Sequence, residues 1–340
     1  MTGLGSGTVS PPKGDARRVF DLRAYAPTSW SWLKSLRVHP ITTILVVTSV
    51  LSGPAQAQSE DTDPRRLDCR YEQSDGETRQ SAFPKDDVFR PLLADPKQPR
   101  FFASWQATRV RTSQTSVNIG SVGFGENFGF YTRRDGCNGW QVGLLAGVFS
   151  QFNLDAPSSD LINADYIVGI PLSWRSGGWS TRVRLYHQSS HIGDEFLLGR
   201  PGFNRVNLSF EEIEAIVSYD YRWARLYAGG GYLVDRQPAT LDRMRAQWGF
   251  ELRGPTMDSP ILGTMLTGLR ITPVLGTDFK SFEELNWVIN TNVVGGIEWS
   301  MEGSTRRFQV LANYYHGFAP YGQFFAQKVE WFGIGLYLSL

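Results

Sequence analysis

The sequence predicts an all-β protein, a transmembrane antiparallel up-and-down β-barrel of about 12 strands and of the outer-membrane type. Apolar and polar residues alternate from Phe101 onward, segment after segment, which is the period of strands with one apolar face. Many of the apolar stripes begin or end on Trp or Tyr, as barrel strands do at the two membrane interfaces. A secretory leader precedes these segments, so the protein is expected in the cell outer membrane.

The amino-acid composition, taken as an average, describes an ordinary soluble protein of one or two domains. The chain has 340 residues, of which 34 are basic and 33 acidic, and its mean hydropathy is −0.26. This mean hydropathy is too low for a bundle of membrane helices. The balanced charge gives no basic surface of the kind that binds nucleic acid. With 2 cysteines, the chain cannot form a disulfide-dense scaffold. Barrel strands remain compatible with these averages, because each strand adds one apolar and one polar face.

A secretory signal peptide is expected within residues 1–57, behind an N-terminal extension. A basic flank with Lys34 and Arg37 precedes an apolar run at 41–51 (ITTILVVTSVL), and Ala55-x-Ala57 supplies a cleavage site. The run is too short to cross a bilayer core of about 30 Å as a helix, and a buried helix is the alternative. Cleavage after Ala57 leaves 340 − 57 = 283 residues, exported into an oxidising compartment.

The segment that follows the leader, residues 58–100, is polar and contains prolines without a clear period. It is therefore expected in the periplasm or at the mouth of the barrel. Cys69 falls in this segment, and Cys137 falls in a predicted periplasmic turn between two strands. Both cysteines are then on the same side of the membrane in an oxidising space, which predicts a Cys69–Cys137 disulfide.

The predicted disulfide would close a loop of about 68 residues and stabilise the fold by roughly 4 kcal/mol in the chain-entropy model. Alkylation of thiols followed by mass measurement tests this pairing, because Cys69 and Cys137 are expected to react only after reduction. Two thiols that react without a reductant would contradict the prediction.

Twelve segments show the alternation, at about 20 residues per strand with its connection, which is near the usual spacing in such barrels. At 162–174, for example, seven apolar residues occupy alternate positions, with Asn, Asp and Ser among the residues between them. An even number of strands places both ends of the barrel in the periplasm. Short connections after strands two, four and six, and long ones after five and eleven, agree with that orientation. The predicted strands are residues 101–111, 117–133, 140–154, 161–175, 179–191, 205–221, 223–235, 245–253, 264–279, 286–300, 306–316 and 330–340.

The last predicted strand carries a signal of its own. Phe332, Ile334, Leu336, Leu338 and Leu340 alternate up to the final residue. Outer-membrane barrels commonly end in such a strand, which the barrel-assembly machinery reads, although the final residue is usually Phe or Trp rather than Leu. The expected partners are therefore this machinery and outer-membrane lipid, lipopolysaccharide included.

Charged residues on the faces opposite the apolar stripes predict a polar lumen. A lumen of this strand number is narrow, so it could be a narrow passive channel or be closed by mutual ion pairs. The alternative architecture is a soluble sandwich or barrel with its apolar faces turned inward, which the charged faces and the aromatic stripe ends disfavour. The expected lumen charges are Asp165, Arg182, Arg184, Glu212 and Glu214.

A His-x-Ser pair is the main candidate for chemistry. On the predicted strand 179–191, the alternation directs His187 and Ser189 toward lipid near the extracellular end. Residues two apart on one strand face lie about 6–7 Å apart at Cα, so a Ser nucleophile and a His base could meet. A third group should orient the imidazole, and the next strand would bring Asn207, Ser209 or Glu211 beside it.

This His-x-Ser on the outer face of a barrel resembles the outer-membrane phospholipase A and lipid A deacylase enzymes, the first of which also has twelve strands. The resemblance implies an esterase of lipid acyl chains with His187, Ser189 and Asn207 as catalytic residues. It implies no cofactor except calcium, if the activity is that of a phospholipase. Those families follow the Ser with Asn, whereas Ser190-His191 follow here. The alternative is that both residues bind lipopolysaccharide headgroups or loop backbone at the rim.

A longer resemblance covers about residue 83 to the C-terminus. The stretches 83–96 (FPKDDVFRPLLADP), 186–198 (YHQSSHIGDEFLL) and 229–232 (GGGY) are similar to the bacterial family catalogued as domain of unknown function 1207. The resemblance implies an exported envelope protein and supplies no activity. A metal site is not expected from the histidines, because His187 and His191 would lie about 13 Å apart on a strand.

Overall fold

The computed structural model describes residues 79–84, 86–136, 138–200, 202–259, 268–301, 304 and 306–339. The predicted signal peptide, Cys69 and Cys137 lie outside the described residues. None of the helices among the described residues is long and apolar enough to cross a membrane.

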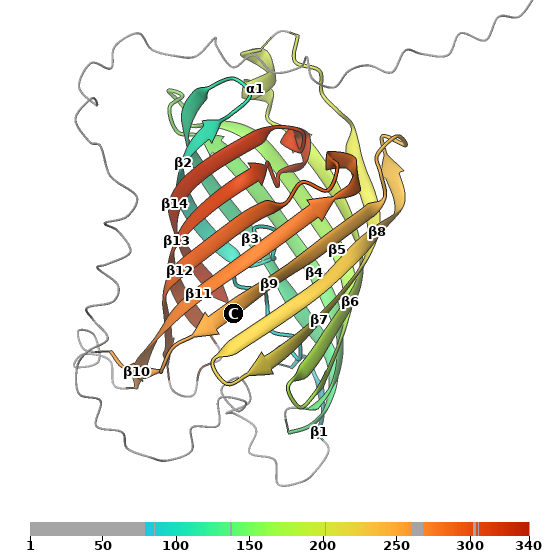
Figure 1. Cartoon of the computed structure of the whole chain (residues 1–340), viewed down its shortest axis with the longest axis vertical. Helices are drawn as coiled ribbons and strands as arrows, with labels where there is room; N and C mark the ends of the chain where they lie inside the picture. Colours follow the sequence, from blue (N-terminus) through green and yellow to red (C-terminus); the bar gives the residue numbers. More distant parts are fainter. Residues whose placement is uncertain are drawn as a thin grey trace, which may run out of the picture.

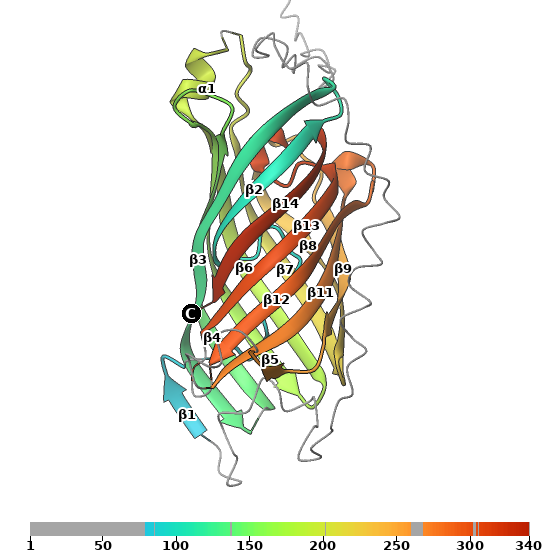
Figure 2. The ribbon, with the colours of Figure 1, turned by 90° about the vertical axis from the view of Figure 1, so that its left-hand side faces the viewer.

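The described residues form one closed antiparallel barrel of twelve strands, as the sequence predicts (Figure 1, Figure 2). Neighbours in the chain pair with each other, β9 pairs with β11, and β14 pairs with β2 to close the ring. All twelve predicted strands are present, close to their predicted positions. The barrel strands are β2 (Phe101–Val110), β3 (Thr115–Asp135), β4 (Asn138–Asn153), β5 (Asp160–Ser176), β6 (Trp179–Ile192), β7 (Leu208–Tyr221), β8 (Ala224–Gln237), β9 (Met244–Arg253), β11 (Leu269–Phe282), β12 (Asn290–Met301), β13 (Arg307–Phe318) and β14 (Lys328–Ser339).

The short elements occupy the two ends of the barrel. α1 (Asp194–Leu198), η4 (Glu283–Leu285) and η5 (Gly322–Phe324) lie in connections at the upper end in Figure 1. β1 (Arg79–Ala82) pairs with the lower end of β3, and β10 (Met257–Asp258) pairs with the start of β11. The longer connections after β6 and β13 both lie at the upper end, which is typical of the extracellular side of such barrels.

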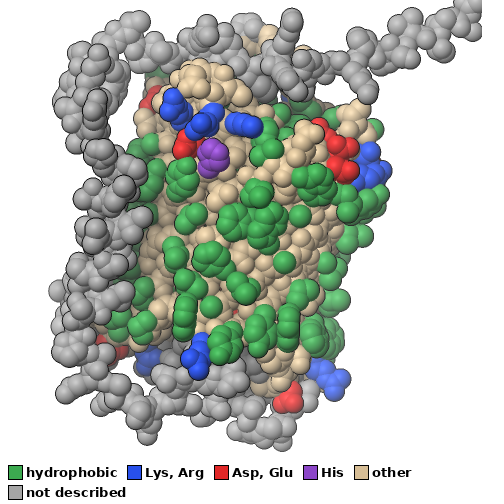
Figure 3. All heavy atoms as spheres, viewed as in Figure 1, with side chains coloured by type: hydrophobic (Ala, Val, Ile, Leu, Met, Phe, Trp, Pro, Cys, Tyr) green, Lys and Arg blue, Asp and Glu red, His purple; other side chains and the backbone are tan. Residues whose placement is uncertain are grey.

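The outer surface carries an apolar belt, because alternate residues of each strand point away from the interior. On β5, Tyr166, Val168, Ile170, Leu172 and Trp174 are all exposed, while most of the residues between them are buried. In Figure 3, hydrophobic side chains are spread over the middle of the surface, whereas charged side chains lie toward its two ends. A closed barrel with such a belt satisfies every backbone hydrogen bond inside the sheet and presents apolar side chains to lipid. The molecule is therefore a transmembrane barrel of the outer-membrane type.

The chain enters the interior of the barrel at the place where β3 changes its pairing partner. β1 pairs with residues 131–134 of β3, and β2 pairs with residues 115–123 of the same strand. Between β1 and β2, the chain turns inward past Gly129. A Cβ atom at Gly129 would lie 2.6 Å from Cγ of Pro84, so only glycine permits this close approach.

Candidate active site

Two neighbouring strands bring an imidazole and a carboxylate together on the outer surface. In the register of β6 and β7, His187 stands opposite Glu211, and Ser189 opposite Ser209. These odd-numbered side chains point outward, because most of their even-numbered neighbours are buried. Nδ1 of His187 lies 2.8 Å from Oε1 of Glu211, and the two side chains are 41% and 43% exposed.

A carboxylate at Nδ1 prepares an imidazole for general-base chemistry at its other nitrogen. When Nδ1 donates its hydrogen to Glu211, Nε2 of His187 carries a lone pair that can accept a proton. Ser189 lies two residues further along the same face, at about 6–7 Å between Cα atoms by strand geometry. No hydrogen bond joins His187 to Ser189 in the described part of the chain, and such bonds are often loose before substrate binds.

The structure brings Glu211, and not Asn207, to the imidazole. Asn207 is exposed and immediately precedes β7, whose first residue stands opposite Ser190. Asn207 is therefore beyond Ser189 in the pairing, whereas the side chain of Glu211 reaches Nδ1 of His187. The sequence already offered Glu211 as one of three neighbours, but the register that decides among them depends on the conformation of the connection 193–207.

The His187 site lies at the upper border of the apolar belt. Toward the middle of the barrel, the same outward faces carry Leu185 and Ile213, which are 51% and 47% exposed. On the other side, β5 places Val168 opposite His187 and Tyr166 opposite Ser189. His187 and Ser189 therefore lie at the upper edge of an apolar outer surface that β5, β6 and β7 share.

Metal-binding groups are not gathered at this site. Among the described residues, no cluster of three or more His, Cys, Asp or Glu side chains could hold a metal ion. His191 contacts Tyr166 edge to face, with 5.5 Å between ring centroids. Asp194 and Glu195 lie in the first turn of α1.

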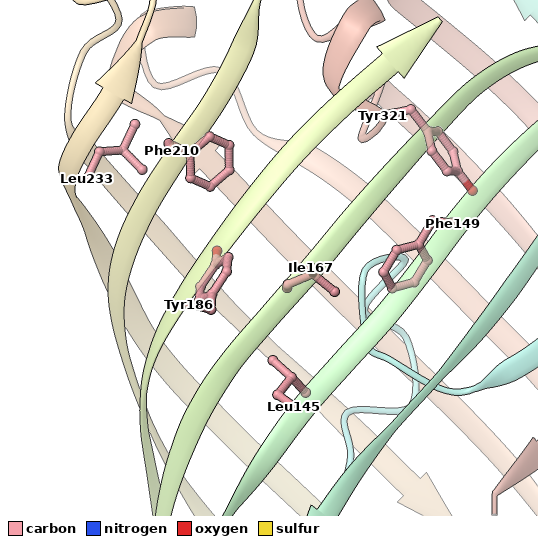
Figure 4. Packing of buried hydrophobic residues seen from close by; sticks show 7 residues of the cluster. All are labelled: Leu145, Phe149, Ile167, Tyr186, Phe210, Leu233 and Tyr321. Carbon is pink, nitrogen blue, oxygen red and sulfur yellow. The ribbon is translucent and has the colours of Figure 1, made fainter. Parts of the chain in front are cut away.

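Residues 86–100, which form the inner segment, cross the interior of the barrel. The sequence placed residues 58–100 in the periplasm or at the barrel mouth, and the described part at 86–100 lies inside the barrel. Asp95 pairs with Lys280 of β11 at 2.6 Å, while the neighbouring Lys97 pairs with Asp165 of β5. Since β5 and β11 lie on different sides of the ring, these two contacts span the lumen. In Figure 4, the teal trace of this segment lies inside the barrel, between the nearer green strands and the fainter orange strands of the far wall.

The wall of the barrel carries its own ion pairs beside this segment. Both Arg182 and Arg184 bind Glu214, at 2.9 and 2.6 Å, and Arg245 binds Glu212 at 2.6 Å. The five charged residues expected in the lumen, Asp165, Arg182, Arg184, Glu212 and Glu214, are all buried. Buried charges need partners of this kind, because the loss of one partner leaves the other uncompensated.

The connection after β13 folds into the same interior from the upper end. The buried Tyr321 belongs to the same hydrophobic cluster as Phe149 and Tyr186, and its ring lies beside that of Phe149 (Figure 4). The Gly322 N–H donates to Oδ2 of Asp165 at 3.0 Å, and Gln323 donates to the carbonyl oxygen of Ser190 at 2.9 Å. Lys97 lies 4.8 Å from the Tyr321 ring centroid, so this connection and the inner segment meet.

Two cavities lie on either side of the inner segment. The upper cavity, of about 130 Å³, is lined by Pro96 and Lys97 together with wall residues of β5 to β9 and of β11 to β13. The lower one, of about 590 Å³, is lined by residues 86–88 and 90–93 together with residues near the lower end of the wall. The segment 88–97 therefore stands between the two spaces.

The closed ring of strands, the apolar belt and the filled interior define the class of protein as an outer-membrane barrel. More particularly, the chain belongs to the family described as protein of unknown function (DUF1207), whose profile matches residues 45–339. This confirms the resemblance found in the stretches 83–96 and 186–198. No curated protein matches the sequence.

Solved structures of other outer-membrane barrels are similar to this one. Outer membrane phospholipase A from Escherichia coli is 11% identical, with 74% of this chain and 93% of that chain covered and a TM-score of 0.45. The beta domain of the Bordetella autotransporter BrkA is 11% identical, with coverages of 70% and 97% and a TM-score of 0.39. LpxR from Salmonella typhimurium is 9% identical, with coverages of 70% and 100% and a TM-score of 0.36.

Proposed function

We propose that this protein is an outer-membrane hydrolase of lipid acyl esters, with Ser189 as nucleophile, His187 as base and Glu211 as the orienting carboxylate. The observation that supports this function is the 2.8 Å contact between Nδ1 of His187 and Oε1 of Glu211 on the outer surface. Such a contact gives the imidazole the tautomer and orientation that a serine hydrolase requires.

The reaction follows from the roles of the three side chains. Nε2 of His187 takes the proton of the Ser189 hydroxyl while Oγ attacks the acyl carbonyl, forming a tetrahedral intermediate. The C–O bond to the lipid alcohol then breaks, and His187 gives the proton to the departing oxygen, leaving an acyl ester on Ser189. Water, deprotonated by His187, attacks this ester and releases a fatty acid and the free serine. Glu211 stays ionised throughout and stabilises the imidazolium.

The position of the site supports a lipid as the substrate. Both side chains of the dyad face outward between the apolar belt and the connection that contains α1. A soluble substrate would not contact the apolar belt, whereas a membrane lipid would place its acyl chains on the belt and its ester bonds at the height of Ser189. The inner segment and the buried ion pairs support a role of the interior as a rigid scaffold, so we propose no open passive channel.

Fatty-acid release from vesicles tests the proposal. The purified barrel is reconstituted into vesicles that contain phospholipid and lipid A, with and without calcium, and free fatty acids are measured by mass spectrometry. We expect release that depends on the protein and on at least one of the two lipids. An absence of release under all of these conditions would contradict the function.

We further propose that the protein reaches the outer membrane through cleavage after Ala57. The protein isolated from outer membranes is then expected to begin at Gln58, as N-terminal sequencing would show. Ala55→Leu/Ala57→Leu is expected to block this processing, because the cleavage site requires small side chains. A mature protein that retains residues 1–57 would contradict cleavage.

A further inference from the structure

A group of basic side chains lies on the outer surface opposite the His187 site. Three neighbouring strands, β13, β14 and β2, change from apolar to basic at their upper ends. Arg109 and Arg111 stand at the end of β2, Lys328 begins β14, and His316 is near the end of β13; all four are exposed. Figure 3 shows a histidine at this end, with Lys and Arg side chains above it and hydrophobic side chains below it.

The pairing register places these residues in one patch. Glu330 of β14 stands opposite Arg109 on one side and opposite His316 on the other. Arg111 follows β2 directly, and its backbone N–H donates to the carbonyl oxygen of Lys328 at 2.8 Å. The four basic side chains therefore surround a single carboxylate.

The patch has an excess of positive charge. Arg109, Arg111 and Lys328 carry three positive charges against the one negative charge of Glu330, which leaves a net of +2 without His316. Glu330 binds Nη1 of Arg111 at 2.7 Å and accepts a hydrogen bond from the Tyr314 hydroxyl at 2.7 Å. Since the Arg111 side chain remains 47% exposed, its guanidinium keeps donors for a further anion.

The surface directly below the patch is apolar. Tyr314, Phe332 and Ile334 continue the outward faces of β13 and β14 and are 41%, 57% and 49% exposed. A ligand that fills both regions has acyl chains joined to a headgroup with negative charge. Guanidinium and ammonium groups recognise phosphate in particular, because they provide charge-assisted hydrogen bonds to its oxygens.

We propose that Arg109, Arg111, His316 and Lys328 bind the phosphate of a phosphorylated lipid in the outer leaflet, whose acyl chains pack on Tyr314 and Phe332. This site is independent of the proposed hydrolase site, because β14 and β7 lie on opposite sides of the ring of strands. The ligand is a membrane lipid and not a free anion, since the apolar surface below the patch contributes to its binding.

Native mass spectrometry of the purified full-length barrel tests this site. Lipid A that carries two phosphates is compared with lipid A after enzymatic removal of the phosphates, and inorganic phosphate is added as a competitor. The charge-neutralising variant is Arg111→Gln/Lys328→Gln. The control is Arg222→Gln, an exposed arginine in the β7–β8 turn at the other end of the barrel. Each variant is checked for folding by electrophoresis in detergent without heating, in which a folded barrel keeps its own band.

We expect phosphorylated lipid A to bind the wild type and the control, and to bind Arg111→Gln/Lys328→Gln roughly 10-fold more weakly, as expected for the loss of charge-assisted contacts. Equal binding of dephosphorylated lipid A, or unchanged binding by the double variant, would overturn the proposal. Displacement of the lipid by inorganic phosphate at a similar concentration would assign the patch to free anions and would also overturn it.

Discussion

Ser189→Ala is expected to lower fatty-acid release by at least about 10³-fold, because the variant has no nucleophile while the barrel and the His187–Glu211 contact remain. Ser209→Ala is the matched control, since Ser209 is the cross-strand neighbour of Ser189 and points to the same outer face. Release is measured on reconstituted vesicles by mass spectrometry. A Ser189→Ala protein with wild-type release, or an equal loss in Ser209→Ala, would contradict the role of Ser189.

The orienting role of Glu211 has its own signature. Glu211→Gln keeps the shape of the side chain but no longer stabilises the imidazolium of His187, so kcat is expected to fall by up to about 10⁴-fold with little change in KM. Asn207→Ala serves as the control, because Asn207 precedes β7 and does not face the imidazole. A larger loss in Asn207→Ala than in Glu211→Gln would reverse the assignment.

Loss of the inner segment is expected to convert the closed barrel into a conducting one. A mature chain that begins at Pro99 lacks β1 and the residues that stand between the two cavities. Single-channel recording in planar bilayers should show steps several-fold larger than those of the wild type, because the contacts from Asp95 to Lys280 and from Lys97 to Asp165 are absent.

A second variant covers the case in which the shortened chain does not fold. Asp95→Asn/Lys97→Met keeps the segment but removes both ion pairs across the lumen, so brief openings are expected to replace the closed state. Ser81→Ala is the control, because Ser81 is an exposed residue of β1, and the barrel of this variant should remain closed. Wild-type currents from the folded truncated protein would show that residues 79–98 do not close the lumen.

The strands could be predicted from the sequence because each one reports on its own environment. In β5, alternate residues contact lipid and the interior, so the period of two at 162–174 is a local signal. The path of 86–100 leaves no such signal. Its partners are distant, as with Asp95 and Lys280, which are 185 residues apart, and they become neighbours only when the ring closes.

For the candidate site, too, the sequence predicts what depends on one strand and not what depends on the pairing of two strands. The positions of His187 and Ser189 on one outward face follow from the alternation within β6 alone. The third residue required the register between β6 and β7, and one step of two residues in that register would exchange Glu211 for Ser209 opposite His187. This register depends on the connection between β6 and β7, whose conformation cannot be read from the alternation of residues. The sequence therefore left Asn207, Ser209 and Glu211 as three candidates for the residue that orients the imidazole.

The most direct test of the outer-face hydrolase site is the location of a covalent adduct. The folded barrel is treated with a fluorophosphonate, with and without calcium, and the modified peptide is identified by mass spectrometry. The proposed chemistry predicts one adduct on Ser189 that is absent from His187→Ala, since the imidazole is needed to activate the hydroxyl. An adduct on another serine, or no adduct under either condition, would contradict it.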